Sequence, residues 1–409
     1  MAQEVSFPKQ KIKIVLAEKI HEAAADYLSE AGFNVNFVPR ALEGKELDDT
    51  IADAHVIGVR SRTKLRRAQL EHARRLLAVG CFSVGTDQVE LDAATSLGVP
   101  VFNAPYSSTR SVAELTIGNI IMLARRAGDK NTKLHLGEWD KSLANAEEVR
   151  GKTLGIVGYG HIGQQVSILA EAFGMEVVFC DVLKKLPLGR AKPVASLDEL
   201  LALSDFVTLH VPGTAETKNL IGAPQLKKMR KGRYLLNLSR GNVVDVAALV
   251  ESLKNGDIGG AALDVFPDEP VPPIAPFATE LAKCENVILT PHVGGNTEEA
   301  QHKIALEVAN ALEEFVNSGK TEGSVNFPSV NLRPFPNSHR ILNIHRNVPG
   351  ALVEITKMVS EVGANIDAQH LSTFKDIGYL VMDINRDLSE EVKTKIAGLP
   401  ISIKTRILY

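Results

Sequence analysis

The feature that most limits the fold of this chain is a glycine-rich turn between an apolar run and a helical pattern. The run TLGIV is followed at once by GYGHIG, which contains Gly158, Gly160 and Gly163, and then by QQVSILAEAFG. Gly158 permits a tight turn, Gly160 lets backbone amides approach a pyrophosphate, and Gly163 allows close packing of helix on strand. The next apolar run ends at Asp181, eighteen residues after Gly163, where a carboxylate accepts hydrogen bonds from ribose hydroxyls and repels a 2′-phosphate. A merely structural glycine turn needs none of this context, so the motif predicts NAD binding.

Short β-branched runs alternate with helical patterns along most of the chain, which is typical of parallel α/β architecture. In the first part of the chain we expect a helix over 21–31 and buried strands at 13–17, 35–38, 56–60, 78–81 and 99–103. A second series of apolar runs each ends in a polar residue or proline: TLGIVGYG, EVVFCD, DFVTLHVP, RYLLNLSRG, GAALDVF and NVILTPH. Because ligands bind beyond the carboxyl ends of parallel strands, those polar residues are candidates for chemistry.

With 409 residues the chain is too long for one hydrophobic core, and its pattern predicts three domains. Helices over 111–124 and 297–314 bracket the second series of strands, and the segment after them, SVNFPSVNLRPFPN, indicates a linker. The last part of the chain predicts strand, helix, strand, strand, helix, strand, a ferredoxin-like βαββαβ module. The expected fold class is α/β, with two doubly wound parallel-sheet lobes and this module. We expect a discontinuous flavodoxin-like substrate lobe at 1–108 and 296–336, a Rossmann lobe at 109–295 and the βαββαβ module at 337–409.

Composition excludes several classes of function. A net charge of -3, from 46 basic and 49 acidic side chains, argues against binding nucleic acid or a membrane surface. The 3 cysteines form no CxxC motif and the histidines no HExxH motif, so we expect neither a disulfide framework nor a metal site. The amino-terminal segment lacks an apolar leader, and the longest apolar stretch, 115–124, is too short to span a bilayer, so we expect a cytoplasmic protein.

Three later strand ends carry the catalytic candidates. LNLSRG places Arg240 after a strand, DVFPDEP places Glu269 in a turn, and LTPHVGG places His292 after the sixth strand of the series. Hydride transfer to a 2-keto acid needs a proton donor and a cation for the carboxylate. His292 can supply the proton, Glu269 would raise the pKa of its imidazole, and Arg240 would clamp the carboxylate. Taken singly, such residues are more often an ion pair, a solvated turn acid and a helix cap, but their conjunction favours catalysis.

Taken together, these motifs resemble those of a known enzyme family. GYGHIG, HVPGTAETKNLIG, RYLLNLSRGNVVDVAAL, GGAALDVFPDEP and NVILTPHVGG resemble the successive motifs of NAD-dependent D-2-hydroxyacid dehydrogenases. VRSRT, GCFSVGTDQVELDAA, NAPYSSTRSVAEL and the C-terminal module are most similar to the short bacterial-type members of that family. The resemblance implies NAD as cofactor and the oxidation of 3-phospho-D-glycerate to 3-phosphohydroxypyruvate, which is the first step of L-serine biosynthesis.

The resemblance also assigns residues. It gives the catalytic roles to Arg240, Glu269 and His292. Asp264 suits the nicotinamide carboxamide, although acceptor bonding within an α/β turn is an alternative role for its carboxylate. The implied cofactor contacts are Gly158, Gly160, His161, Ile162, Gly163, Asp181, Leu238, Ser239, Arg240, Asp264, His292, Val293, Gly294 and Gly295.

The substrate phosphate requires more positive charge than Arg240 alone. Arg60 and Arg62 flank Ser61 at a strand end of the first lobe, and an arginine pair suits a dianionic phosphate. The alternative is a solvated basic loop. Ser108 stands where the family usually has asparagine, and a hydroxyl replaces one hydrogen bond of an amide but not its donor and acceptor together.

The C-terminal module resembles an ACT domain, a small-molecule sensor that pairs through its sheet edges. HRNVPGAL sets His345 and Asn347 before a strand-to-helix turn, and Asn365 follows the first helix in GANI. Exposed imidazole and amide groups suit the ammonium and carboxylate of an amino acid, and the resemblance implies that L-serine binds between paired modules as an allosteric inhibitor. The alternative is a module used for assembly, with Asn365 as a turn residue.

The single tryptophan, Trp139, lies in the polar segment LGEWDKS. Such a residue either fills a core or contacts another subunit. The family resemblance implies a homotetramer, whose expected interfaces are the NAD lobes and the C-terminal modules.

Two other functions compete with this interpretation. A glyoxylate or hydroxypyruvate reductase of the same family would need neither the arginine pair nor a serine-sensing module. An NAD-sensing corepressor would bind peptides in a surface cleft and show little turnover. The sequence leaves activity on 2-oxoglutarate open.

Overall fold

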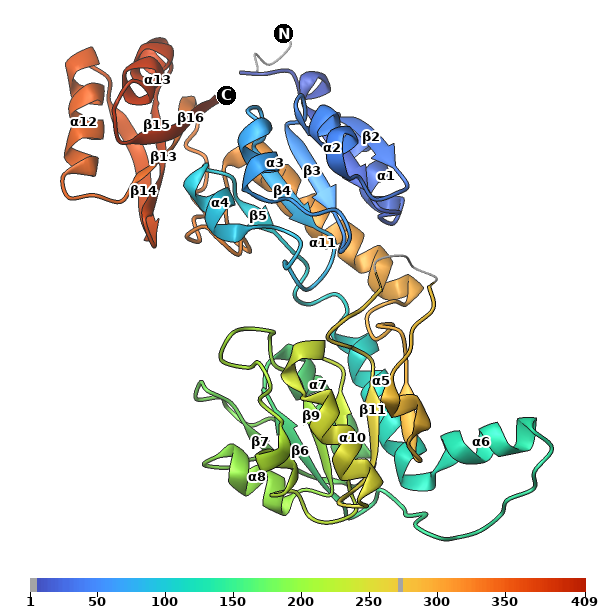
Figure 1. Cartoon of the computed structure of the whole chain (residues 1–409). Coiled ribbons are helices and arrows are strands. Elements are labelled where there is room, and N and C mark those ends of the chain that lie inside the picture. Colours follow the sequence, from blue (N-terminus) through green and yellow to red (C-terminus); the bar gives the residue numbers. More distant parts are fainter. Residues whose placement is uncertain (1–5, 271–274) are drawn as a thin grey trace. The chain divides into compact units, whose positions relative to one another are not determined.

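The computed structural model describes residues 6–270 and 275–409, and the chain divides into two compact units (Figure 1). One unit is Ser108–Ala300, and the other combines Met1–Ser107 with Gln301–Tyr409. The combined unit carries two sheets and the Ser108–Ala300 unit carries one. The finer division into three domains stays a prediction.

The Ser108–Ala300 unit is built on a seven-stranded parallel sheet with the order β12-β11-β10-β9-β6-β7-β8. Its strands are β6 (Thr153–Val157), β7 (Glu176–Cys180), β8 (Lys192–Pro193), β9 (Phe206–Leu209), β10 (Arg233–Asn237), β11 (Ile258–Leu263) and β12 (Val287–Leu289). The chain order reverses direction between β6 and β9, and this switch point is where doubly wound sheets bind ligands. The expected Rossmann lobe is confirmed.

Helices cover both faces of this sheet. The helices of this unit are α5 (Thr109–Arg125), α6 (Ala127–His135), α7 (His161–Ala172), α8 (Leu197–Leu203), α9 (Ala223–Leu226), α10 (Val246–Lys254) and the short 3-10 helices η2 (Gly241–Val243) and η3 (Glu280–Lys283). Val112 of α5 and Val166 of α7 share one buried cluster with Ile156, whereas Leu200 of α8 and Leu249 of α10 belong to another. The first turns of α8 and α10 are capped by side chains, as is common for Ser and Asp.

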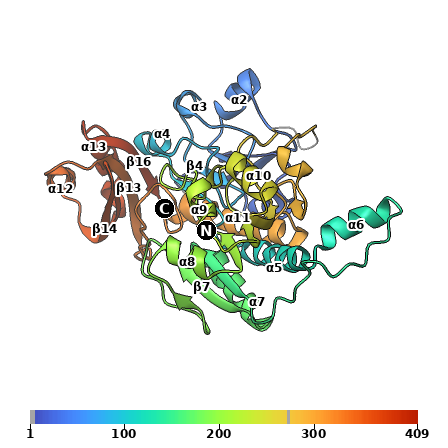
Figure 2. The same ribbon diagram turned by 60° about the horizontal axis from the view of Figure 1, so that its bottom comes forward.

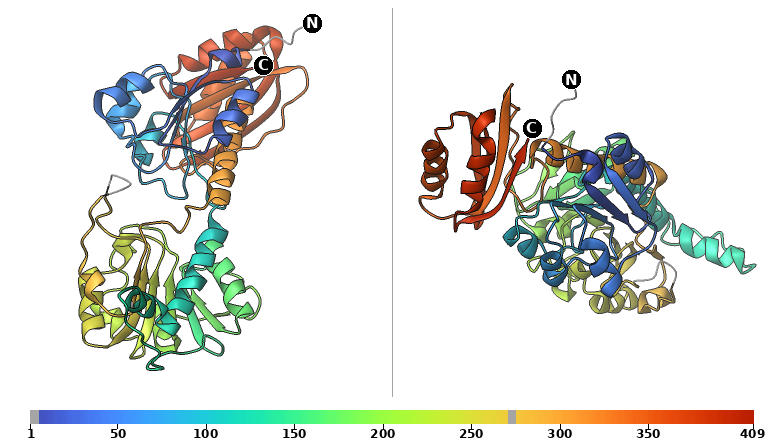
Figure 3. Two further views of the ribbon diagram at one scale, coloured as in Figure 1. Left: turned by 90° about the vertical axis from the view of Figure 1, so that its right-hand side faces the viewer. Right: turned by 90° about the horizontal axis from the view of Figure 1, so that it is seen from above.

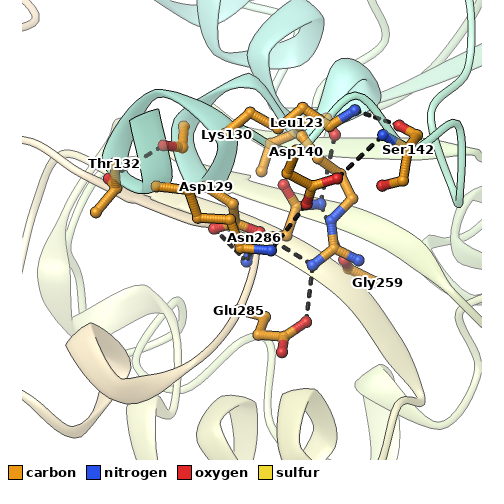
Figure 4. A network of polar contacts seen from close by, with 12 residues as sticks. Leu123, Asp129, Lys130, Thr132, Asp140, Ser142, Gly259, Glu285 and Asn286 are labelled. Atoms are coloured by element: carbon orange, nitrogen blue, oxygen red, sulfur yellow. Dashed lines mark hydrogen bonds and ion pairs between the residues drawn. The ribbon is translucent and has the colours of Figure 1, made fainter. Parts of the chain in front are cut away.

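Helix α6 extends away from the sheet and begins after Arg126, whose φ is 50° (Figures 1 and 2). Figure 4 shows the contacts that hold the first turn of α6, the base of the helix. The Asp129 carboxylate accepts hydrogen bonds from Asn286 N at 3.0 and 3.1 Å. Asn286 Nδ2 donates to the carbonyl oxygens of Leu123 and Gly259, at 3.3 and 3.0 Å. Helices α5 and α6 are therefore fixed to the sheet at this point.

Beyond this anchored base the segment exposes apolar side chains. Trp139 is 80% exposed, and Leu134, Leu136 and Leu143 are exposed beside it in sequence. Trp139 therefore does not fill the core of its own chain, and the first of the two roles expected for it is wrong. A set of large apolar side chains in solvent is typical of an interaction surface.

The amino-terminal sheet is five-stranded and parallel, with the order β2-β1-β3-β4-β5. Its strands are β1 (Lys13–Ala17), β2 (Asn34–Val38), β3 (Val56–Val59), β4 (Ala78–Cys81) and β5 (Val101–Phe102). This is the expected flavodoxin-like order. Its helices are η1 (Lys9–Lys11), α1 (Ala23–Glu30), α2 (Gly44–Ile51), α3 (Arg67–His72), α4 (Leu91–Ser96) and α11 (Glu298–Ser318). Helix α11 returns from far along the chain and buries Val308 and Leu312 against the sheet beside Leu28 of α1, which makes the lobe discontinuous.

The C-terminal sheet is antiparallel, with the order β14-β15-β13-β16 of a ferredoxin-like module. Its elements are β13 (Ser338–Arg346), α12 (Ala351–Val362), β14 (Ile366–Phe374), β15 (Ile377–Asn385), η4 (Arg386–Leu388), α13 (Ser389–Ala397) and β16 (Ser402–Leu408). Both helices lie on one face of the sheet (Figure 3), where Ile355 and Ile396 pack on Ile341 and Leu380. The expected βαββαβ order is confirmed.

The other face of the C-terminal sheet packs against the end of α11. Leu342, Ile344 and Val381 share a buried cluster with Phe315 of that helix. Polar groups at the same place are paired, because Tyr379 donates its hydroxyl to the carbonyl oxygen of Gly319 at 2.6 Å. The carbonyls at the end of a helix have no partner within it, so this module satisfies groups that α11 cannot satisfy itself.

A buried ion pair reinforces this contact. Arg340 donates from Nε and Nη2 to the two oxygens of Asp383, at 2.6 and 2.7 Å, and from Nη1 to the carbonyl oxygens of Ser318 and Leu332 at 3.0 and 2.8 Å. Both charged side chains are almost inaccessible to solvent. Removing one partner of such a buried pair strongly destabilises the fold, because the other charge is then left buried and unpaired.

Candidate active site

The glycine turn lies between β6 and α7, at the switch point of the seven-stranded sheet. Gly158 has a φ of 89°, and a Cβ there would lie 2.5 Å from the carbonyl oxygen of His210. A Cβ on Gly163 would lie 2.4 Å from the carbonyl oxygen of Gly158. A Cβ on Gly160 would meet no described atom within 4 Å, so the space before the start of α7 at His161 is open. A helix amino terminus facing open space suits a pyrophosphate.

Asp181 connects this turn to the end of β7. Its Oδ2 accepts a hydrogen bond from Tyr159 N and its Oδ1 accepts one from Leu183 N, both at 2.8 Å. The carboxylate is thereby fixed beside the glycine turn, at the place where a Rossmann fold holds the adenosine ribose. The open turn and this acidic strand end fit NAD.

The segment Leu238–Arg240 follows β10 and is shaped by a residue that the sequence did not single out. Asn237 is 1% exposed, and its Oδ1 accepts from both the amide and the hydroxyl of Ser239, at 3.1 and 2.8 Å. Its Nδ2 donates to the carbonyl oxygen of Arg240 at 2.9 Å. The turn that carries Arg240 is therefore held by one buried amide on both sides.

The loop after β12 is held by Asp264 at the end of β11. Its Oδ1 accepts from Thr290 Oγ1 at 2.6 Å and from Val293 N at 2.9 Å, and its Oδ2 accepts from Gly294 N at 2.8 Å. His292 lies in this loop with a φ of 54°, a region that residues other than glycine rarely adopt. The carboxylate thus stabilises a strained backbone at His292, and its expected contact with the cofactor stays a prediction.

Glu269 and His292 form a hydrogen-bonded pair, with Glu269 Oε2 2.8 Å from His292 Nδ1. This hydrogen bond raises the pKa of His292, and burial opposes the rise. Burial acts to raise the pKa of Glu269, but the hydrogen bond and charge of His292, the hydrogen bond from Phe266 N and the charge of Arg240 together outweigh burial and lower that pKa. The positive charge of Arg240 acts to lower the pKa of both groups. The structure therefore brings the three candidates from three strand ends together, and the arrangement suits a general acid–base.

Ser108 and Gly295 lie against each other within the same unit. Ser108 is 2% exposed, and a Cβ added at Gly295 would lie 3.2 Å from Ser108 Cβ. Glycine at 295 therefore allows α5 to approach the His292 loop closely. A contact of the Ser108 hydroxyl with substrate stays a prediction.

His210, at the end of β9, is a further residue that the sequence left unassigned. Its Nε2 lies 3.0 Å from Thr208 Oγ1, and burial lowers its pKa to about 3, so the ring is neutral. Its buried Nδ1 has no hydrogen-bond partner within the described ranges. The motif HVPGTAETKNLIG contains this histidine but gives no signal that its Nδ1 is buried.

The basic loop expected to hold a phosphate follows β3 in the other unit. Ser61 is exposed, and Arg60 and Arg62 are partly buried. Burial lowers the pKa of Arg60, and the nearby charge of Glu18 opposes that shift. Arg62 Nε is buried and has no hydrogen-bond partner in the described part of the chain. An arginine in this state favours a ligand over the alternative of a fully solvated loop.

The C-terminal module places its three expected ligand residues differently from one another. Asn347 and Asn365 are exposed, and Asn347 Nδ2 donates to the carbonyl oxygen of Lys375 at 3.2 Å. His345, by contrast, is 2% exposed. The expectation of an exposed imidazole is wrong, because His345 lies on β13, a central strand of the sheet. The His345 ring packs against Gly378, and its Nδ1 lies 2.9 Å from Asn343 Oδ1.

Membrane-spanning helices and metal-binding clusters are both absent from the described residues. None of the helices within 6–270 and 275–409 is long and apolar enough to cross a bilayer. The same residues contain no group of three or more side chains placed to hold a metal ion.

A Rossmann sheet with an open glycine turn, an acidic residue after the second strand and a His–Glu pair at the strand ends defines the site of an NAD-dependent dehydrogenase. The NAD-binding domain of D-isomer specific 2-hydroxyacid dehydrogenases matches residues 117–294, and the AHAS small subunit-like ACT domain matches residues 341–404. A D-3-phosphoglycerate dehydrogenase from Dictyostelium discoideum is 52% identical over 100% of both chains. The enzyme of that name from Escherichia coli K12 is 47% identical over 99% of this chain and 100% of its own.

A solved structure extends the comparison. The D-lactate dehydrogenase of Aquifex aeolicus, complexed with NAD and lactic acid, matches with a TM-score of 0.68 and 30% identity, over 77% of this chain and 100% of its own. This chain belongs to the D-3-phosphoglycerate dehydrogenase family of NAD-dependent D-2-hydroxyacid dehydrogenases. The resemblance found in the sequence is confirmed, with NAD as cofactor and an ACT domain at the C-terminus.

Proposed function

We propose that this chain uses NAD to oxidise 3-phospho-D-glycerate to 3-phosphohydroxypyruvate, the first step of L-serine biosynthesis. The observation that carries the proposal is the Glu269–His292 hydrogen bond of 2.8 Å beside the charge of Arg240, in a NAD-binding domain. The family relationship over the whole chain favours the phosphorylated substrate over other hydroxy acids.

His292 carries the proton transfer in this proposal. Because its Nδ1 faces Glu269, Nε2 is the nitrogen left to bind the substrate hydroxyl. In the oxidation the neutral ring accepts the hydroxyl proton. NAD, when bound, would supply the acceptor for the hydride that leaves the carbon carrying this hydroxyl. The resulting imidazolium is stabilised by the Glu269 carboxylate, and Arg240 binds the substrate carboxylate.

The substrate phosphate is assigned to the basic loop. Arg60, Ser61 and Arg62 provide two guanidinium groups and a hydroxyl, which match the oxygens of a dianion. The buried Arg62 Nε without a described partner supports this assignment. Ser108 would add one hydrogen bond to the substrate.

The regulatory part of the proposal is feedback inhibition by L-serine. Asn347 and Asn365 are exposed amides of an ACT domain, and each can bind the ammonium and carboxylate groups of an amino acid. The buried His345 would not contact the ligand. It would hold β13, the strand that precedes Asn347, in place through its contact with Gly378. The ligand would bind where two modules pair, and its effect on turnover would be allosteric.

The assembly proposed is a cytoplasmic homotetramer. One interface would include the exposed apolar residues around Trp139, and the other would join the C-terminal modules. The exposed apolar surface supports the first interface. An exposed, long outer strand, β14, at the edge of the module supports the second.

The test is an assay of NADH oxidation with 3-phosphohydroxypyruvate, with L-serine titrated into the same reaction. Turnover that serine suppresses without competing with substrate supports both halves of the proposal. Turnover without inhibition leaves the C-terminal module with a role in assembly alone. Bound NADH without turnover contradicts the proposal and points to another hydroxy acid, such as glyoxylate, or to a sensing role tested by peptide pull-down with NADH.

A further inference from the structure

Glu18 is a buried carboxylate that accepts hydrogen bonds from four successive backbone amides. It follows β1 and is 7% exposed. Its Oε1 lies 3.2 Å from the amide nitrogen of Arg60 and 2.7 Å from that of Thr63. Its Oε2 lies 3.1 Å from the amide nitrogen of Ser61 and 2.8 Å from that of Arg62. The whole basic loop is therefore wrapped around one side chain that is distant in sequence.

The backbone at Glu18 is strained in order to reach this loop. Its φ is 69° and that of Lys19 is 49°, both in the left-handed region that favours glycine. The Glu18 amide is fixed as well, since it donates to the carbonyl oxygens of Val38 and Arg40, both at 3.0 Å. A strained conformation persists where the surrounding contacts over-determine it, and such conformations cluster at binding sites.

Four consecutive amides that point to one place form an anion-binding concavity. In this chain the concavity is filled by the protein's own carboxylate, so a substrate anion cannot use those amides. The side chains of Arg60, Ser61 and Arg62 are then the groups left to bind it. The buried Nε of Arg62, which lacks a partner among the residues described, is in accord with this division.

We propose that Glu18 is a positioning residue, whose carboxylate holds the backbone of residues 60–63 in the shape that presents Arg60, Ser61 and Arg62 to the substrate phosphate. The inference rests on the proposed function and adds to it a residue that does not touch the substrate. The charge matters as well as the shape, because four N–H donors converge on it and a buried carboxylate is stable only when it is fully hydrogen-bonded.

The test begins with Glu18→Gly, which removes the carboxylate and suits the φ of this position. We expect its KM for the phosphorylated substrate to rise by about tenfold to a hundredfold, as for a misplaced binding group, with kcat and the KM for NADH changed by less than about twofold. The matched control is Lys19→Gly, an exposed neighbour with the same backbone conformation, whose constants should equal those of the wild type.

Chemical rescue separates positioning from general instability. Formate or acetate should fill the vacated concavity of Glu18→Gly and restore its KM, while neither anion should improve the wild type. Glu18→Gln should show a raised KM that these anions do not rescue, because its amide still occupies the space. This second variant also serves if Glu18→Gly does not fold.

The outcomes separate the two proposals. Wild type and Lys19→Gly that fail to turn over 3-phosphohydroxypyruvate would overturn the proposed function and this inference with it. Active controls together with an unchanged KM in Glu18→Gly or Glu18→Gln would overturn the positioning role alone. A raised KM in both variants, restored by formate in the glycine variant, supports it.

Discussion

His292 Nδ1 lies 2.8 Å from Glu269 Oε2, so the imidazole is bound on one side and has one nitrogen left for chemistry. Because His292 has a φ of 54°, asparagine is the substitution best matched to its backbone. His292→Asn should lower kcat by about a hundredfold to ten-thousandfold, the range for loss of a general acid–base. The affinity for NADH, measured by fluorescence titration, should stay within about twofold of wild type. A loss of NADH affinity as large as the loss of kcat would contradict a purely catalytic role.

The raised pKa of His292 predicts opposite pH dependences for the two directions of the reaction. Oxidation needs the neutral ring, so its kcat/KM should fall as the pH drops through this pKa, and reduction should fall as the pH rises through it. Glu269→Gln removes the hydrogen-bonded carboxylate that causes the rise, so both limbs should move to lower pH. Rate profiles in both directions check this, and limbs that stay in place would exclude the proposed coupling.

Asp181 should determine the choice of cofactor. Replacing it with serine removes charge-assisted hydrogen bonds to the ribose, and the KM for NAD should rise by about tenfold or more. Discrimination against NADP should fall at the same time, because the repulsion of a 2′-phosphate is lost. Steady-state kinetics with both cofactors measure this. The control is Glu176→Gln, an exposed acid at the start of the same strand, and equal effects in both variants would refute the assignment.

Asn347 should affect inhibition and leave turnover unchanged. Asn347→Ala removes an exposed amide of the ACT domain, so serine inhibition should be lost or weakened by about tenfold or more while kcat remains that of wild type. Inhibition curves for Asn347→Ala and Asn365→Ala test this. Asn331→Ala, an exposed amide outside the module's turns, is the control. Unchanged inhibition in both of the first two variants would leave the module with a role in assembly.

Trp139 should hold subunits together. With 80% of the residue exposed in a single chain, its burial in an interface would remove much apolar area from water. Trp139→Ala should therefore yield a smaller assembly, and Trp139→Phe should retain the larger one. Analytical ultracentrifugation gives the mass directly. An alanine variant with the mass of the wild type would place the interface elsewhere.

Local pattern predicted the strands well where an apolar run had clear ends. The expected strands 13–17 and 78–81 have the bounds of β1 and β4. The strand expected at 99–103 shrinks to Val101–Phe102, because Pro100 has no amide hydrogen for the sheet. Helix α6 was missed because AGDKNTKLH has no apolar stripe, and its base is held by the distant Asn286.

Within the candidate site, the sequence singled out residues whose types suit the proposed chemistry and missed those that hold the backbone around them. Arg240, Glu269 and His292 stand out because they follow strands, and such ends meet at one edge of a parallel sheet. Asn237 and Glu18 act through contacts that depend on the folded backbone, so no local pattern marks them. The burial of His345 depends on which neighbours flank β13, and this too is a tertiary property.

The central strands of the C-terminal sheet, β13 and β15, are covered on both faces, since the module's helices pack on one side and the end of α11 packs on the other. We therefore do not expect this module to be a separate cooperative unit of unfolding. Heating should therefore melt it together with the lobe that contains α11, and calorimetry should resolve transitions for the two compact units, although the chain has three sheets. The C-terminal module and the lobe that contains α11 should therefore unfold in one transition.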